Sequence, residues 1–71
     1  MTQKEIIAEL TTRFTREGIL NCAKDDNVNP HHFLTMFIYD IYGIQEGEAC
    51  RIATEILKFF NINNEKLIKI N

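Results

Sequence analysis

The chain is short and slightly acidic, with 71 residues, 45% of them hydrophobic, and a formal net charge of −2. This balance is typical of a single globular domain, here residues 1–71, and excludes a disordered chain. Nucleic-acid binders of this size usually carry a basic excess to contact phosphates, so the charge argues against DNA or RNA as a partner.

The first predicted element is an amphipathic helix. Thr2 and Glu5 match a capping box, in which each side chain accepts a hydrogen bond from the other's backbone. The apolar residues that follow share one face of a helical wheel: Ile6, Ile7, Leu10 and Phe14. This apolar phase breaks at Gly18, so we expect the helix to end near Glu17, with Gly18 in the left-handed cap position. Ile19 would then fold back on Phe14, as in a Schellman motif.

The next elements are a short segment, a polar turn and a central helix. Residues 19–24 indicate either a short helix or an irregular turn, and residues 25–29 form the polar turn. Asn29 followed by Pro30 predicts a helix start, and Gly43 predicts its end. Eight of the ten residues 33–42 are apolar or aromatic. We therefore expect this helix to be central and covered on several sides.

A third main helix is predicted to begin at Glu48. Its apolar residues form one continuous stripe: Ala49, Ile52, Ala53, Ile56, Leu57 and Phe60. The tail, residues 65–70, suits either a short helix or a strand, and we favour a helix because no second strand is evident to pair with it. The predicted fold is all-α, a small bundle of three main helices plus a short C-terminal helical element.

The residue types that usually bind metals do not have metal-binding spacing. His31 and His32 are adjacent and point about 100° apart on a helix, so they are expected to be surface or capping residues. Cys22 and Cys50 are far apart in the chain and are interpreted as small buried residues with free thiols in a reducing compartment. We expect no metal and no cofactor.

No pattern of residues predicts catalysis. The three glycines, at positions 18, 43 and 47, all lie at predicted helix boundaries and form no phosphate-binding loop. No nucleophile has a visible partner, so we expect no enzyme activity and no small-molecule substrate. The polar start at residues 2–5 argues against a signal peptide, and the apolar stretch 33–42 is too short to span a bilayer. A cytoplasmic protein without a membrane partner is expected.

One part of the chain resembles the helix-turn-helix of AraC-type regulators. There, a small residue, a turn ending in Val-Ser-Pro, a helix and Gly-Ile follow in that order. The matching residues are Ala23, Val28, Asn29, Pro30, Phe33, Phe37, Gly43 and Ile44. The resemblance implies a small DNA-binding transcriptional regulator. Gly43 is displaced by one position, however, and the would-be recognition helix contains no Arg or Lys to read bases.

Several apolar side chains lie off the predicted core stripes: Tyr39, Tyr42, Phe59, Ile62, Ile68 and Ile70. Aromatic residues outside a core often mark an interface. We therefore predict a non-enzymatic module that binds a protein partner, or itself as a homodimer, through Tyr39, Tyr42 and Phe59. The alternatives are that the central helix is simply well covered, and that the chain is the DNA-binding regulator described above.

Overall fold

The computed structural model describes residues 1–63 and has four helices in this part of the chain. These are α1 (Gln3–Arg13), α2 (Arg16–Asp25), α3 (Pro30–Tyr42) and α4 (Glu46–Phe59). Residues 1–63 contain no strand, so the all-α prediction is confirmed for this part of the chain. The number of helices differs from the prediction, because α2 is a full helix. The predicted C-terminal element, residues 65–70, lies outside the described residues.

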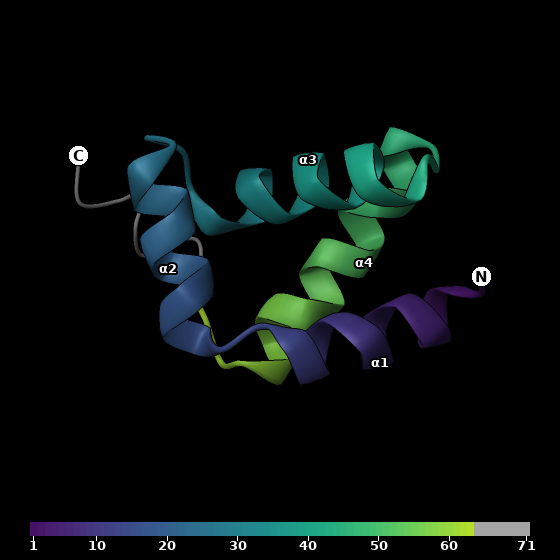
Figure 1. Cartoon of the computed structure of the whole chain (residues 1–71), viewed down its shortest axis with the longest axis horizontal. Helices are drawn as coiled ribbons and strands as arrows, with labels where there is room; N and C mark the ends of the chain where they lie inside the picture. The colour runs from purple at the N-terminus through teal and green to yellow at the C-terminus, as the bar shows by residue number, and fades with distance from the viewer. Residues whose placement is uncertain (64–71) are drawn as a thin grey trace.

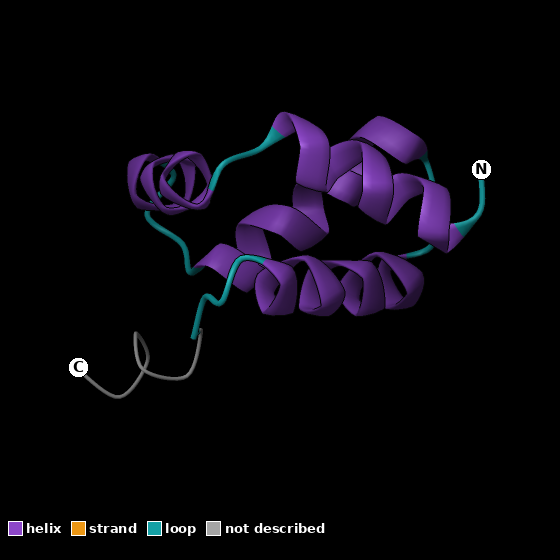
Figure 2. Ribbon diagram, turned by 90° about the horizontal axis from the view of Figure 1, so that it is seen from below, coloured by secondary structure: helices purple, strands orange, loops and turns teal. Residues whose placement is uncertain are grey.

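α3 and α4 form the central pair of the bundle. The most extensive helix pair is α3 with α4, while α1 packs against α4 and α2 packs against α3. Figure 1 shows α4 running obliquely between α3 and α1, with α2 lying across the beginning of α3. Figure 2 shows α2 nearly end-on at one end of the molecule. This arrangement gives α4 neighbours on more than one side and leaves part of α3 without cover.

The predicted end of the first helix at Gly18 is wrong. α1 ends at Arg13, and the two residues that follow, Phe14 and Thr15, have extended backbone conformations. Thr15 is the N-cap of α2, and its hydroxyl accepts a hydrogen bond from the Gly18 N–H at 3.0 Å. Gly18 therefore lies in the first turn of α2 rather than in a left-handed cap. The break in apolar phase comes from the extended link between two helices, not from a glycine.

The other helix ends follow the local sequence closely. The capping box of α1 is present, with Glu5 N–H donating to Thr2 Oγ1 at 3.2 Å and Thr2 N–H donating to Glu5 Oε1 at 2.7 Å. Asn29 caps α3, and Gly43 ends it with a left-handed φ of 63°. These predictions are confirmed. α4 begins two residues earlier than predicted, at Glu46.

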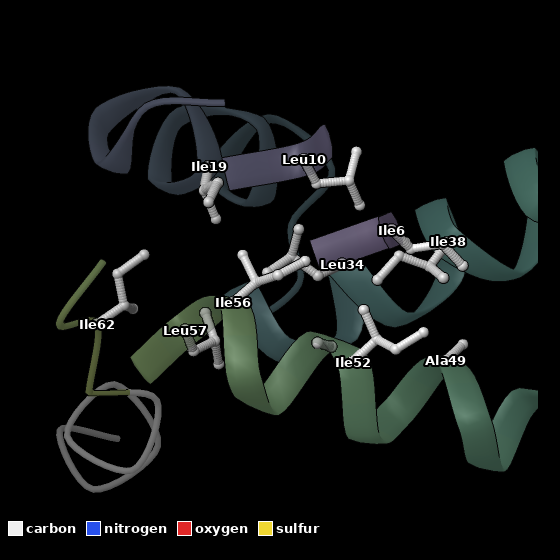
Figure 3. Packing of buried hydrophobic residues seen from close by; sticks show 11 residues of the cluster. Ile6, Leu10, Ile19, Leu34, Ile38, Ala49, Ile52, Ile56, Leu57 and Ile62 are labelled. Carbon is white, nitrogen blue, oxygen red and sulfur yellow. The ribbon is translucent and has the colours of Figure 1, made fainter. Parts of the chain in front are cut away.

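The hydrophobic core lies on the inner face of α4. Figure 3 shows side chains from the four helices and from the segment after α4 converging there. The buried residues in this cluster are Ile6, Leu10, Ile19, Leu34, Ile38, Ala49, Ile52, Ala53, Ile56, Leu57 and Ile62. The predicted stripe of α4 is confirmed, with Phe60 half-buried at its end. Ile62 was predicted to be surplus and is instead part of the core.

The helix α3 is covered on one side only, in contrast to the prediction that it would be enclosed. Leu34 and Ile38 are fully buried, whereas Met36, Tyr39 and Ile41 are exposed. The reason is geometric. Because α2 is only about 15 Å long and lies across the beginning of α3, it covers little of the later turns.

Candidate functional site

The three residues predicted to bind a partner do not form one surface. Tyr39 lies near the end of α3 and is 45% exposed, and Phe59 ends α4 and is 65% exposed. α3 and α4 are joined by a short loop, so Tyr39 lies near the beginning of α4. The length of α4, about 20 Å, separates this point from Phe59. Tyr42 is half-buried and belongs to neither exposed region.

Tyr42 makes a structural contact. Its hydroxyl donates a hydrogen bond to the Glu9 carboxylate of α1. Partial burial raises the pKa of the Tyr42 phenol above its ordinary value, and the hydrogen bond to Glu9 and the negative charge of that carboxylate raise it further. The contact joins the end of α3 to the middle of α1. Tyr42 is thus engaged within the chain, which leaves Tyr39 as the more accessible of the two tyrosines.

The outward side of α3 carries the exposed side chains of Met36, Tyr39 and Asp40, together with His32 one turn earlier. Tyr39 and Asp40 follow Met36 by three and four residues, so each is a neighbour of Met36 on the helix surface, one on either side of it. Ile41 is 63% exposed but follows Met36 by five residues and points about 140° away from it. The outward side of α3 is therefore centred on Met36 and does not include Ile41.

Two adjoining hollows follow this side of the helix. The first, called the α3 groove from here on, is lined by Asp26, Val28, His32, Phe33, Met36, Phe37 and Asp40. The second shares Asp40 and is lined also by Tyr39, Gly43, Ile44 and Gln45. Together they form a continuous surface from the turn before α3 to the loop after it, called the α3 surface below. Sequence reasoning identified Tyr39 in this surface but missed the groove beside it.

The two aromatic rings that line the groove pack against a third ring, that of Phe14. Phe14, in the link between α1 and α2, packs edge-on against Phe33 and Phe37, with ring centroids 6.1 and 5.2 Å apart. Such edge-to-face pairs favour fixed ring orientations. Phe33 and Phe37 are half-buried, so each ring contributes to the internal packing as well as to the groove. The groove therefore has a firm apolar floor.

His31 joins the beginning of α3 to α4. Its Nε2 lies 3.0 Å from Thr54 Oγ1, 3.2 Å from the Cys50 carbonyl oxygen and 3.7 Å from Cys50 Sγ. Because a carbonyl oxygen only accepts hydrogen bonds, this contact requires a proton on Nε2. The neighbouring His32 is exposed and lines the α3 groove instead. Within residues 1–63, no group of three or more His, Cys, Asp or Glu side chains is placed to hold a metal ion.

Both cysteines are exposed and unpaired, so the prediction that they are buried is wrong. Cys22 precedes Ala23, which is buried, and Cys50 follows Ala49, which is also buried. Adjacent residues of a helix point about 100° apart. Each cysteine therefore lies just outside the buried stripe of its helix.

Comparison of the chain with protein family models, with curated proteins and with solved structures finds no match in any of the three. Among the helices of residues 1–63, none combines the length and the hydrophobicity needed to cross a membrane. The α3 surface is therefore interpreted from its own geometry.

Proposed function

We propose that this protein is a non-enzymatic interaction module that binds a protein partner through the α3 surface. The observation that carries the proposal is the exposure of Met36, 38%, in a groove lined by aromatic rings, and of Tyr39, 45%, in the hollow that adjoins it. Methionine and tyrosine are enriched in protein interfaces, because both bury a large apolar area and adapt well to a partner. An exposed apolar surface of this kind is typical of a binding site.

Phe59 forms a separate exposed point at the other end of α4. It packs edge-on against Phe60, with ring centroids 5.0 Å apart. No described hollow includes Phe59, although one lies nearby at Leu57, Lys58 and Ile62. We therefore place the contact on α3 and leave Phe59 outside it.

DNA binding is the second candidate function. The order of α2, a short turn and α3 supports it, since helix-turn-helix proteins use such a pair. Against it, α3 contains no Arg or Lys, and its outward side carries Asp40. Phosphate and base contacts rely mainly on basic and amide side chains. A gel-shift assay with mixed-sequence duplex DNA at low salt should show no complex, and a salt-sensitive complex would favour this candidate.

Site-specific photo-crosslinking in the native host tests the interaction proposal. A benzophenone amino acid replaces Met36 in the α3 surface or, as the control, Glu55, whose side chain is exposed on α4. We expect a discrete crosslinked protein from position 36 and none from position 55. The absence of a product at position 36, or the same product at both positions, would overturn the proposal. Light scattering of the purified protein then shows whether the partner is a second copy.

A further inference from the structure

The α3 groove combines an apolar floor with negative charge at its borders. Val28, Phe33, Met36 and Phe37 contribute the apolar lining. Asp26 borders the groove from the turn after α2, and Asp40 borders it one helical turn beyond Met36. Asp40 also lines the adjoining hollow beside Tyr39. A segment lying along α3 would therefore pass both carboxylates.

Within residues 1–63, no basic side chain forms an ion pair with these carboxylates. The ion pair found among residues 1–63 is that of Lys58 with Glu55 on α4, and neither Asp26 nor Asp40 takes part in one. No Lys or Arg lines the groove, where His32 is the remaining ionisable side chain. The apolar floor is thus flanked by two acidic groups that have no basic partner among residues 1–63. Such a site attracts cationic ligands and repels anionic ones.

This charge pattern disfavours a second copy of the chain as the occupant. Two copies that met symmetrically at this groove would bring two pairs of Asp26 and Asp40 into one interface. The lining of the groove would supply no Lys or Arg to either copy. Like charges brought together in a desolvated interface raise the free energy of binding. A wholly apolar partner is disfavoured for a different reason, because it would cover the two carboxylates without offering them hydrogen bonds.

We infer that the occupant of the α3 groove is a basic amphipathic helix of a partner protein. This inference rests on the function proposed above and names the chemistry of the partner. Apolar side chains at helical spacing contact Phe33, Met36 and Phe37, as in other helix-in-groove complexes. Lys or Arg side chains on the flanks of that helix pair with Asp26 and Asp40 by charge-assisted hydrogen bonds. The apolar contacts provide affinity, and the two carboxylates select for a basic partner.

Two model peptides of equal length test the inference, one composed of Leu and Lys and the other of Leu and Glu, both in an amphipathic helical pattern. Fluorescence anisotropy measures the affinity of each labelled peptide for the intact protein. We expect binding of the Leu/Lys peptide, weakened by added salt, and no binding of the Leu/Glu peptide. The double variant Asp26→Asn/Asp40→Asn should bind the Leu/Lys peptide about tenfold more weakly, because two rim ion pairs are lost.

The matched control removes two carboxylates elsewhere. Glu17 on α2 and Glu55 on α4 are exposed and lie outside the groove, so Glu17→Gln/Glu55→Gln changes the net charge equally. This control should alter the affinity by less than about twofold. Met36→Ala should weaken binding about fivefold through loss of apolar contact. Circular dichroism confirms that each variant is folded.

The possible results separate the two proposals. Equal affinity for both peptides, or equal weakening by the groove and control variants, would overturn the inference of a basic partner. If position 36 still gave its crosslinked protein, the interaction function would stand, and only the inference of a basic partner would be lost. A dimer that becomes stronger in Asp26→Asn/Asp40→Asn would assign the groove to a second copy and would also overturn the inference. Selective peptide binding without any crosslink at position 36 would overturn the function and retain the charge selectivity.

Discussion

The Tyr42 hydroxyl, at the last residue of α3, donates a hydrogen bond to the carboxylate of Glu9 in the middle of α1. α1 and α3 are separated in the chain by α2, and α1 packs mainly on α4. The contact therefore closes the bundle at the end opposite α2. It also requires Tyr42 to be in its neutral form, because a phenolate has no proton to donate to a carboxylate.

The first prediction concerns the titration of Tyr42. Its folded pKa lies above the ordinary value of 10.0, first because of burial and then because of Glu9. The chain has two tyrosines, so in Tyr39→Phe only Tyr42 titrates. The tyrosinate absorbance of that variant should have its midpoint above pH 10.0. A midpoint at or below 10.0 would contradict the contact with Glu9.

The same shift has a consequence for stability. A pKa raised by folding stabilises the native state fully below the unfolded value, about 10, and this contribution is lost as the pH rises through the folded pKa. In Tyr42→Phe, the decline of the unfolding free energy above pH 10 should therefore be less steep than in the unchanged protein. Urea unfolding at a series of pH values measures this difference, and equal slopes would argue against it.

The second prediction compares two glycines. Gly43 has a φ of 63°, so Gly43→Ala forces a side chain into the left-handed region and should cost about 1 kcal/mol. Gly18 has no positive φ, and a Cβ there would lie 3.0 Å from Thr15 Oγ1. In Gly18→Ala, better helix propensity opposes this close contact, so the net change should be within about 0.5 kcal/mol. A larger loss at Gly18 than at Gly43, measured by urea unfolding, would contradict the boundary between α1 and α2.

The third prediction tests the one-sided cover of α3. Ile38 is completely buried against α4, whereas Ile41 on the same helix is 63% exposed. Removing one methyl group in Ile38→Val should cost about 1 kcal/mol, because it leaves a small cavity. Ile41→Val, the matched control, should change the unfolding free energy by less than about 0.5 kcal/mol. Equal losses at the two positions would mean that α3 is enclosed on both sides.

The fourth prediction concerns the two thiols. Because Cys22 and Cys50 are exposed, both should react with a water-soluble disulfide reagent in the folded protein. Single variants Cys22→Ser and Cys50→Ser allow each rate to be measured separately. Each rate should be close to that of the same protein in urea. A thiol that reacts only after unfolding would be buried, as the sequence had suggested.

The sequence predicted the local features of the fold. The capping box at Thr2, the start of α3 at Asn29 and its end at Gly43 are each set by a few adjacent residues, so each could be identified without a structure. The apolar stripe of α4 was equally clear, since it repeats over the whole helix. The end of α1 was missed because Thr15 and Gly18 offer competing signals, and the threonine cap was overlooked.

What the tertiary structure decided was which faces of these helices are covered. The positions of apolar residues off the predicted stripes indicated surplus apolar surface, and Tyr39 was among them. Tyr42 instead contacts Glu9, and Ile62 belongs to the core. The α3 groove lies between the turn after α2 and the outward side of α3, so Asp26 of that turn and Asp40 of α3 border the same hollow. Helix caps and apolar stripes depend on residues that are near one another in the chain. The burial of a helix face depends on how the helices pack against one another, and no local sequence pattern specifies that packing.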